Sequence, residues 1–209
     1  MQRYPGAQPF TTEQRRIFFG RDKDLEDLHQ LVQLEELVVL YGKSGLGKSS
    51  LLNAGLIPRL QESGQAQPLT IRFGAWTEEA EASPLERTKQ RLLQEVEGET
   101  FLEKIIPQEG SLWSVVKTYH VQRDEQPLVL IFDQFEELFT YPEEQIQVFK
   151  RELTELLKTT IPRRYRQMLD VLPEDVLTPE EEAQLYYPLD TKAVLAIRSD
   201  RMHLLDKLS

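Results

Sequence analysis

The stretch ELVVLYGKSGLGKS, residues 36–49, decides the fold of this chain. Its second half, residues 42–49, matches the pattern G-x-x-x-x-G-K-[ST] at every fixed position. A predicted strand, residues 36–41, enters this pattern, and the run SLLNA, residues 50–54, leaves it as the start of a helix. In this order of strand, glycine-rich loop and helix, backbone N–H groups and the positive end of a helix face a phosphate. The stretch therefore predicts a phosphate-binding loop.

The residue types in this loop suit contact with a nucleoside triphosphate. Glycines at 42, 45 and 47 let the backbone approach a β-phosphate closely, where a Cβ would intrude. Lys48 is placed to reach the β- and γ-phosphate oxygens, and the Ser49 hydroxyl is a candidate ligand for Mg²⁺. The expected nucleotide-binding set in the loop is Gly42, Lys43, Ser44, Gly45, Leu46, Gly47, Lys48, Ser49 and Ser50.

Composition limits the other classes of function. The chain has 209 residues, 40% of them hydrophobic, and a net charge of −10. This charge disfavours a nucleic-acid surface, which needs clustered Lys and Arg. No apolar run approaches the ~18 residues of a membrane span, and the first residues lack the apolar part of a secretory signal. The chain has no cysteine, and its three histidines have no zinc spacing. We expect a cytoplasmic protein with no membrane partner.

Strand and helix patterns alternate along the chain, which predicts an α/β fold of three layers with a mainly parallel sheet. The predicted strands are residues 36–41, 69–76, 127–133 and 192–198, and the main predicted helices are residues 22–34, 48–62 and 143–158. Ser83 and Thr178 each precede a Pro and lie three residues before a Glu, which indicates a capped helix start. For a P-loop domain of the division that this loop resembles, the expected strand order is 5-1-4-3-2, with the first strand inside the sheet.

Three ranges organise the chain in this interpretation. Residues 1–21 are an N-terminal segment, residues 22–209 are the P-loop domain, and residues 160–190 are an insertion or excursion within it. The basic run RRYR, residues 163–166, is expected to be a solvated loop beside acidic helices. The alternative for this run is contact with an acidic partner or a phosphate.

The fifth strand of the expected order is absent, because the sequence stops one short helix after the fourth strand. We therefore expect the chain to be the N-terminal piece of a larger protein, with further C-terminal domains or other subunits as partners. An exposed edge of the first strand would pair with another molecule, a route to self-association. Alternatively, residues 202–209 or residues 1–17 would cover it.

The run LVLIFDQFEELF, residues 128–139, has the form of a Walker B strand. Its apolar part predicts a strand buried on both faces, which carries Asp133 to the same sheet edge as the phosphate loop. Asp133 is there a second candidate for holding Mg²⁺, opposite Ser49. Either Glu136 or Glu137 is placed to activate a water against the γ-phosphate. An acidic helix start without a catalytic role is the alternative for both glutamates.

The fourth predicted strand ends in RSDR, residues 198–201. In the expected order it lies between the first and third strands, so its end points at the γ-phosphate. Arg198 is therefore a candidate for detecting that phosphate through charge-assisted hydrogen bonds. An ion pair of Arg198 with Asp200 or with a Walker B carboxylate is the alternative.

Four sequence boxes in order resemble the bacterial STAND class of signalling NTPases, related to the NACHT and apoptotic ATPases. The boxes are FFGRD at 18–22, GKSGLGKSSL at 42–51, DQFEELF at 133–139 and AIRSD at 196–200. The resemblance implies an ATP/ADP-controlled switch, in signal transduction or defence, with slow Mg²⁺-dependent hydrolysis. It also implies that Gly20 and Arg21 lie near the adenine, and that Glu137 rather than Glu136 activates water.

Two other classes remain open as alternatives. A RecA- or AAA-like motor linked to DNA would place its catalytic Glu after the second strand, where Glu78 and Glu79 lie near, or directly after the Walker B Asp, where this chain has Gln134. A P-loop kinase of small molecules is the less favoured alternative. A Ras-like GTPase is disfavoured, because the guanine-reading N-K-x-D is missing.

Overall fold

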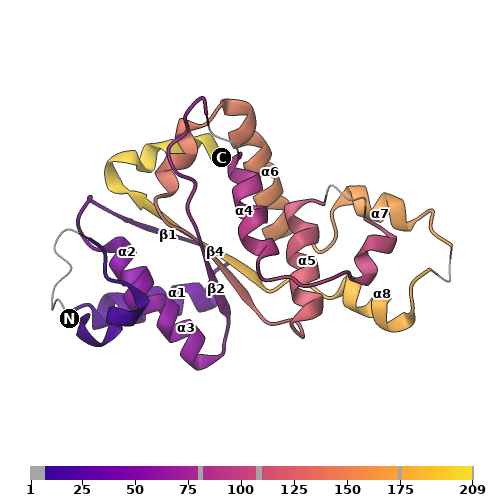
Figure 1. Ribbon diagram of the computed structural model, residues 1–209, viewed down its shortest axis with the longest axis horizontal. Helices are drawn as coiled ribbons and strands as arrows, with labels where there is room; N and C mark the ends of the chain where they lie inside the picture. The colour runs from indigo at the N-terminus through magenta and orange to yellow at the C-terminus, as the bar shows by residue number, and fades with distance from the viewer. Residues whose placement is uncertain (1–7, 80–81, 107–109, 174–175, 209) are drawn as a thin grey trace. The chain divides into compact units, whose positions relative to one another are not determined.

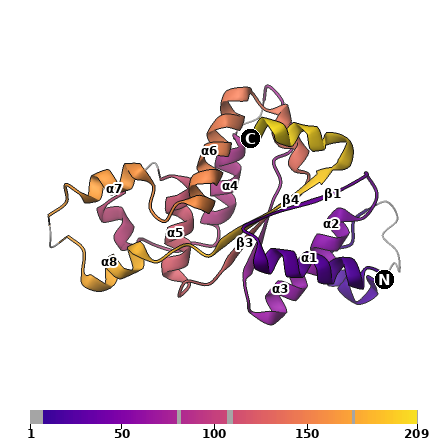
Figure 2. The ribbon, with the colours of Figure 1, turned by 180° about the vertical axis from the view of Figure 1, so that it is seen from behind.

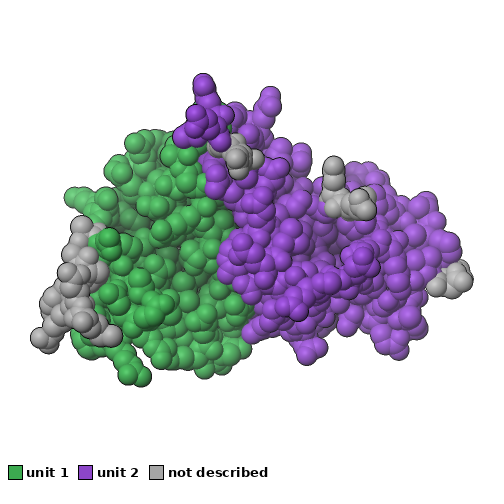
Figure 3. All heavy atoms as spheres, viewed as in Figure 1, with its two compact units in different colours: residues 1–76, 128–140, 192–209 green, residues 77–127, 141–191 purple. Residues whose placement is uncertain are grey.

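The computed structural model describes residues 8–79, 82–106, 110–173 and 176–208. The chain divides into two compact units, which Figure 3 colours separately. Unit 1 comprises Met1–Trp76, Leu128–Thr140 and Lys192–Ser209, and unit 2 comprises Thr77–Pro127 and Tyr141–Thr191. In the described part of the chain, no helix combines the length and apolarity required to cross a membrane.

Unit 1 is built on a parallel four-stranded sheet whose order is β1-β4-β3-β2 (Figure 1). The strands are β1 (Leu37–Gly42), β2 (Gln67–Ile71), β3 (Leu128–Phe132) and β4 (Thr191–Arg198). β1 pairs with β4 in the register Val38↔Val194, and β2 pairs with β3 in the register Leu69↔Leu130. This order confirms the 1-4-3-2 part of the predicted sheet. Among the described residues, β1 pairs with β4 alone.

The described part of unit 1 also contains helical segments. They are η1 (Thr12–Ile17), α1 (Asp22–Leu34), α2 (Lys48–Ser50), η2 (Leu51–Leu56), α3 (Ile57–Ser63), η4 (Phe135–Thr140) and η5 (Ser199–Leu208). Figure 2 shows α1, α2 and α3 on the same side of the strands. Leu28 and Val32 of α1 and Leu56 of η2 pack with Val129 and Val194 in one buried cluster. Apolar burial on this face holds the phosphate loop's helix against the sheet.

The helix that follows the phosphate loop runs without a break from Lys48 to Ser63, close to the predicted 48–62. Its middle part, η2, is π-helical, and Pro58 just after it has no N–H for the regular helical bond. Gly55 lies against Leu25 of α1. A Cβ there would be 3.1 Å from Leu25 Cδ1, so the Leu25 side chain would have to shift to admit a larger residue.

Two predictions about local structure need correction. β2 ends at Ile71, five residues before the predicted end of that strand, because residues 72–76 turn their polar groups to residues 133–140 instead of continuing the ladder. The basic run RRYR is not a loop but the start of α7. Its Tyr165 is buried, and its Arg164 pairs with Glu152 and Glu155, so the run belongs to a packed helix.

Unit 2 is helical in its described part. Its elements are α4 (Pro84–Leu93), η3 (Phe101–Lys104), α5 (Leu112–Gln122), α6 (Glu143–Lys158), α7 (Arg163–Leu169) and α8 (Pro179–Tyr186). The capping boxes predicted at Ser83 and Thr178 are both present. The bounds of α6 equal the predicted 143–158.

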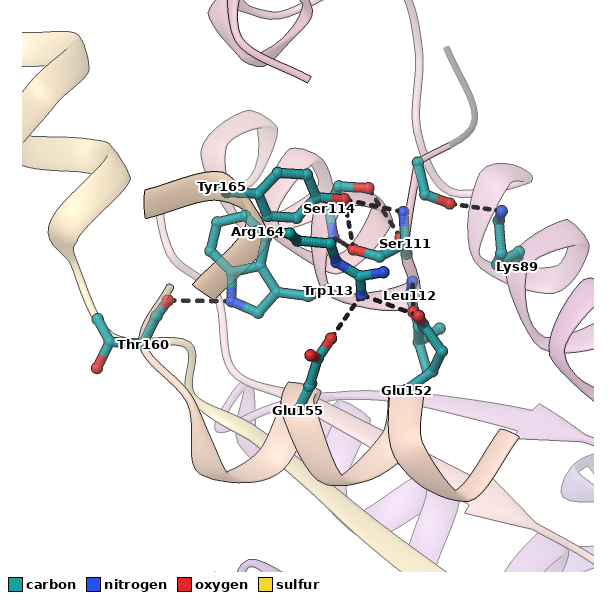
Figure 4. Close-up of polar contacts among 11 residues, drawn as sticks. Lys89, Ser111, Leu112, Trp113, Ser114, Glu152, Glu155, Thr160, Arg164 and Tyr165 are labelled. Carbon is teal, nitrogen blue, oxygen red and sulfur yellow. Dashed lines mark hydrogen bonds and ion pairs between the residues drawn. The ribbon is translucent and has the colours of Figure 1, made fainter. Parts of the chain in front are cut away.

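A polar network around the start of α5 ties α6 and α7 into this unit (Figure 4). The Trp113 indole N–H donates to the Thr160 carbonyl over 3.0 Å, and the Tyr165 hydroxyl donates to Ser111 Oγ over 2.8 Å. The buried Glu152 carboxylate accepts from the Leu112 N–H at 2.9 Å and from Arg164 at 2.9 Å. These contacts satisfy the backbone at the helix start while Trp113 and Tyr165 join the apolar core.

Candidate phosphate-binding site

The predicted phosphate loop connects β1 to α2 at the carboxyl edge of the sheet (Figure 1). Gly45 has φ +80° and Gly47 has φ +75°, a backbone conformation that L side chains rarely adopt. Gly47 is the last residue before α2, so it turns the chain into the helix start. The loop therefore presents the first N–H groups of the helix in the manner of an anion site.

Lys48 folds back over this loop. Its Nζ donates to the Gly42 carbonyl over 2.9 Å and to the Lys43 carbonyl over 3.4 Å. Its ammonium thus lies over the loop's own backbone, where a negative phosphate chain would be attracted to it. The neighbouring Ser50 is turned differently, because its hydroxyl oxygen accepts from the Phe10 N–H at 3.1 Å. The side chain of Ser50 is therefore engaged with the N-terminal segment.

Asp133 follows β3 directly and meets the loop from across β4. The Ser49 hydroxyl donates a 2.8 Å hydrogen bond to Asp133 Oδ1, and the Asp133 residue is 2% exposed. Two hard oxygen donors in contact at a helix start fit Mg²⁺, which is held in proteins by one or two carboxylates together with phosphate oxygens. The residues present therefore suit the metal that the sequence pattern predicts.

Arg72 is a site residue that the sequence analysis missed. It follows β2 directly, and its Nε donates to Asp133 Oδ2 over 3.0 Å while its Nη2 pairs with the same oxygen. Its side chain is 47% exposed, in contrast to the buried carboxylate. Arg72 lies inside the predicted strand 69–76, and only a strand end at Ile71 puts it at the edge where the carboxyl ends of parallel strands meet.

Both Walker B glutamates lie in η4, next to Asp133. Glu137 Oε2 accepts from the Gly74 N–H at 2.9 Å, and Glu136 Oε2 accepts from the Arg198 N–H at 3.3 Å. Burial raises the pKa of the Glu137 carboxyl; the Gly74 hydrogen bond opposes this rise, and the nearby Glu136 adds to it. Gln134, directly after Asp133, has φ +60°, so the chain turns sharply at this point.

Arg198 ends β4, as predicted, and its guanidinium pairs with Asp200. The Nε–Oδ1 distance is 3.1 Å and the Nη2–Oδ2 distance is 2.8 Å. The structure thus has the ion pair that was the alternative to a phosphate sensor. Detection of the γ-phosphate by Arg198 stays a prediction. It requires either that this pair opens or that the other N–H groups of the guanidinium reach the phosphate.

The upstream Gly-Arg pair reaches the phosphate loop. Arg21 Nη1 donates to the Leu46 carbonyl over 2.9 Å, and its Nε pairs with Asp24. A Cβ on Gly47 would be 3.6 Å from the same guanidinium. Gly20 has φ +80°, which sets the turn into α1. Contact of Gly20 and Arg21 with a base stays a prediction.

The phosphate loop lies between β1 and α2, and its Ser49 is hydrogen-bonded to Asp133 at the end of β3, two positions from β1 in the sheet. This arrangement defines a nucleotide-binding P-loop NTPase. The chain belongs to the family described as novel STAND NTPase 1, whose model matches residues 4–205. This match confirms the resemblance drawn from the four sequence boxes.

Among solved structures, the chain is similar to the ORC2 protein of Aeropyrum pernix, determined as ADPNP–ADP complexes. The TM-score is 0.50 at 12% sequence identity, and the match covers 90% of this chain and 44% of that one. At this identity the likeness supports the fold alone. The chain spans less than half of the length of that structure. A search of curated proteins gave no match.

Proposed function

We propose that this chain is the nucleotide-binding part of an ATP/ADP-controlled signalling switch, active in signal transduction or defence. One observation carries the proposal: the 2.8 Å hydrogen bond between Ser49 and Asp133, which joins the phosphate loop to the Walker B strand. The family match and the Arg21 contact with Leu46 support it, because they connect the upstream Gly-Arg box to the same loop.

The proposed roles follow from position. Lys48 and the loop N–H groups bind the β- and γ-phosphates, and Ser49 and Asp133 hold Mg²⁺. When bound, the metal neutralises charge on the phosphates. Glu137 accepts a proton from the attacking water, and its raised pKa suits a base that must also release that proton. Gly20 and Arg21 lie toward the adenine side of the loop.

Slow turnover is part of this proposal. The Gly74 N–H holds Oε2 of the Glu137 carboxylate, so a water must be oriented by the other oxygen or the side chain must turn away from this donor. Phosphoryl transfer depends mostly on such positioning. A switch of this kind changes conformation or assembles according to which nucleotide it holds, and hydrolysis resets it.

The motor alternative loses support at one position. A RecA-like enzyme needs a carboxylate after its second strand, and the residue directly after β2 is Arg72. Arg72 contacts Asp133, so the residue directly after β2 is a cation engaged with the Walker B carboxylate and not a base.

Calorimetric titration of the purified chain with ATP, ADP and GTP, each with and without Mg²⁺, tests the proposal. We expect both adenine nucleotides to bind more tightly than GTP, because the N-K-x-D motif that reads guanine is missing. Equal affinity for GTP, or no binding of any nucleotide, would overturn the proposed switch.

A further inference from the structure

One buried carboxylate joins the phosphate loop to an arginine at the far edge of the sheet. Asp133 Oδ1 accepts from Ser49 Oγ, and Asp133 Oδ2 accepts from two nitrogens of Arg72. The three side chains come from the helix after β1, the end of β3 and the end of β2. They form a continuous chain of hydrogen bonds across the edge where a nucleotide's phosphates would lie.

The ion pair between Arg72 and Asp133 uses only one of the two carboxylate oxygens for both arginine nitrogens. A structural Arg–carboxylate pair commonly uses both carboxylate oxygens, in a fork. Here both donors of Arg72 meet a single oxygen, because the other oxygen is committed to Ser49. Asp133 is buried, whereas nearly half of the Arg72 side chain is exposed. The guanidinium therefore keeps a solvent-facing side from which it can reach a further anion.

Arg72 also lies beside the proposed water activator. Its charge lowers the pKa of Glu137, against the larger effect of burial, so the guanidinium is electrostatically close to that carboxylate. Two residues on, the Gly74 N–H binds Glu137 directly. The segment after β2 therefore contacts both Asp133 and Glu137, between which a terminal phosphate would be attacked. Arg198 is also held by an acid through two bonds, but these form a fork to both carboxylate oxygens of Asp200.

We propose that Arg72 distinguishes a nucleoside triphosphate from a diphosphate by donating to the terminal phosphate from its place beside Asp133. This inference rests on the proposed nucleotide-binding function. The guanidinium is planar and always charged, and it can bridge a carboxylate and a phosphate through different N–H groups. With a diphosphate bound, Arg72 stays on Asp133 alone. Arg72 is thus a positive group that responds to the presence of the γ-phosphate.

The test compares affinities for ADP and for the non-hydrolysed analogue ADPNP, both with Mg²⁺, in the wild-type chain and in Arg72→Ala. We expect the variant to lose about 10- to 100-fold in ADPNP affinity, the range of one or two charge-assisted hydrogen bonds, and less than about 3-fold in ADP affinity. Arg72→Lys keeps a positive charge near Asp133 but loses the guanidinium's several N–H groups. Its ADPNP affinity should lie between those of the wild-type chain and Arg72→Ala. This variant keeps the test valid if Arg72→Ala does not fold.

Arg59→Ala is the matched control, because it removes an arginine of similar exposure from an ion pair with Glu26 in the same unit. Its affinities for both nucleotides should equal those of the wild-type chain. An unchanged ADPNP/ADP ratio in Arg72→Ala would overturn the inference, as would an equal loss for both nucleotides. Loss of the ratio in Arg198→Ala alone would overturn it too. If the wild-type chain binds neither nucleotide, the proposed function itself fails.

Discussion

The Ser49 hydroxyl and the Asp133 carboxylate are joined by a 2.8 Å hydrogen bond across 84 residues of sequence. The contact exists because β4 separates β1 from β3 by only one strand, so the ends of both strands reach one point at the sheet edge. A helix start and a buried carboxylate meet there, and the first two predictions depend on this meeting.

Lys48→Ala should abolish nucleotide binding. The ammonium of Lys48 lies over the phosphate loop. Its loss removes the positive charge that would attract the β- and γ-phosphates. Equilibrium binding of ATP and ADP measures the effect, with Lys23→Ala as a control for the loss of one positive charge on the exposed start of α1. Wild-type affinity in Lys48→Ala would contradict the assignment of this loop.

ATP turnover should be slow or undetectable, and any residual rate should be lost in Asp133→Ala and in Glu137→Gln. The first change removes a proposed metal ligand, and the second removes a base while preserving shape. Because burial raises the pKa of Glu137, the residual rate should rise with pH through a midpoint above the ordinary 4.5 of a glutamate. Phosphate release assays between pH 4.5 and 8 measure it. Turnover on the order of ~10 s⁻¹ would favour a motor or kinase.

Acid should destabilise unit 2 through His120. This side chain is fully buried, and its pKa falls from 6.5 to about 4, mainly because burial disfavours the charged ring and also because Lys117 is near. The unfolded chain takes up this proton below about pH 6.5 and the folded chain only near pH 4. Stability is therefore lost as pH falls through this window, by up to ~3 kcal/mol.

Urea unfolding at pH 7 and pH 4.5 measures this loss, and His120→Gln should show a smaller pH dependence. Glu125 faces the ring, with 3.6 Å between its Oε2 and His120 Nδ1, and burial raises its pKa. Its protonation therefore offsets part of the histidine effect, so Glu125→Gln should show a steeper loss. An identical pH dependence in wild type and His120→Gln would refute the prediction.

Glu152→Ala should destabilise the chain by about 2 kcal/mol, the cost of leaving a buried donor without an acceptor. The donor is the Leu112 N–H at the start of α5, which is 2.9 Å from Glu152 Oε2 (Figure 4). Glu152→Gln retains an acceptor oxygen and should lose less than half as much, since Arg164 also pairs with Glu155. Denaturant unfolding measures the free energy of unfolding of both variants. Equal losses of stability would mean that the charge of Glu152, and not its hydrogen bond to Leu112, stabilises the chain.

The edge of β1 should promote association of the isolated chain. Among the described residues β1 pairs with β4 alone, and its Leu37 and Tyr41 are 46% and 61% exposed. Open strand edges with apolar side chains pair with other chains, and a charge on the edge prevents this. Leu37→Lys should therefore reduce a concentration-dependent increase in mass seen by sedimentation. Wild-type chain that stays monomeric at high concentration would contradict this expectation.

The sequence alone predicted the elements whose signals are local. Apolar spacing gave the bounds of α1 and α6, and caps at Ser83 and Thr178 marked helix starts. The spacing of Gly and Lys predicted the phosphate loop. These features depend on neighbours within a few residues, because helical period, capping and left-handed glycines are properties of a short segment. The strand order followed from the loop type.

Only the tertiary structure decided which side chains share a partner at the sheet edge. Arg72 reaches Asp133 across 61 residues, because β2 stops at Ile71 and the next residue lies beside the end of β3. Arg198 turns to Asp200, and Glu137 to the Gly74 N–H. Such choices depend on strand register and on the direction of each turn, which fix side-chain positions to within a hydrogen-bond length. A linear sequence pattern specifies neither the register nor the direction of a turn. Sequence reasoning therefore placed the loop and the carboxylates but missed Arg72, which contacts Asp133.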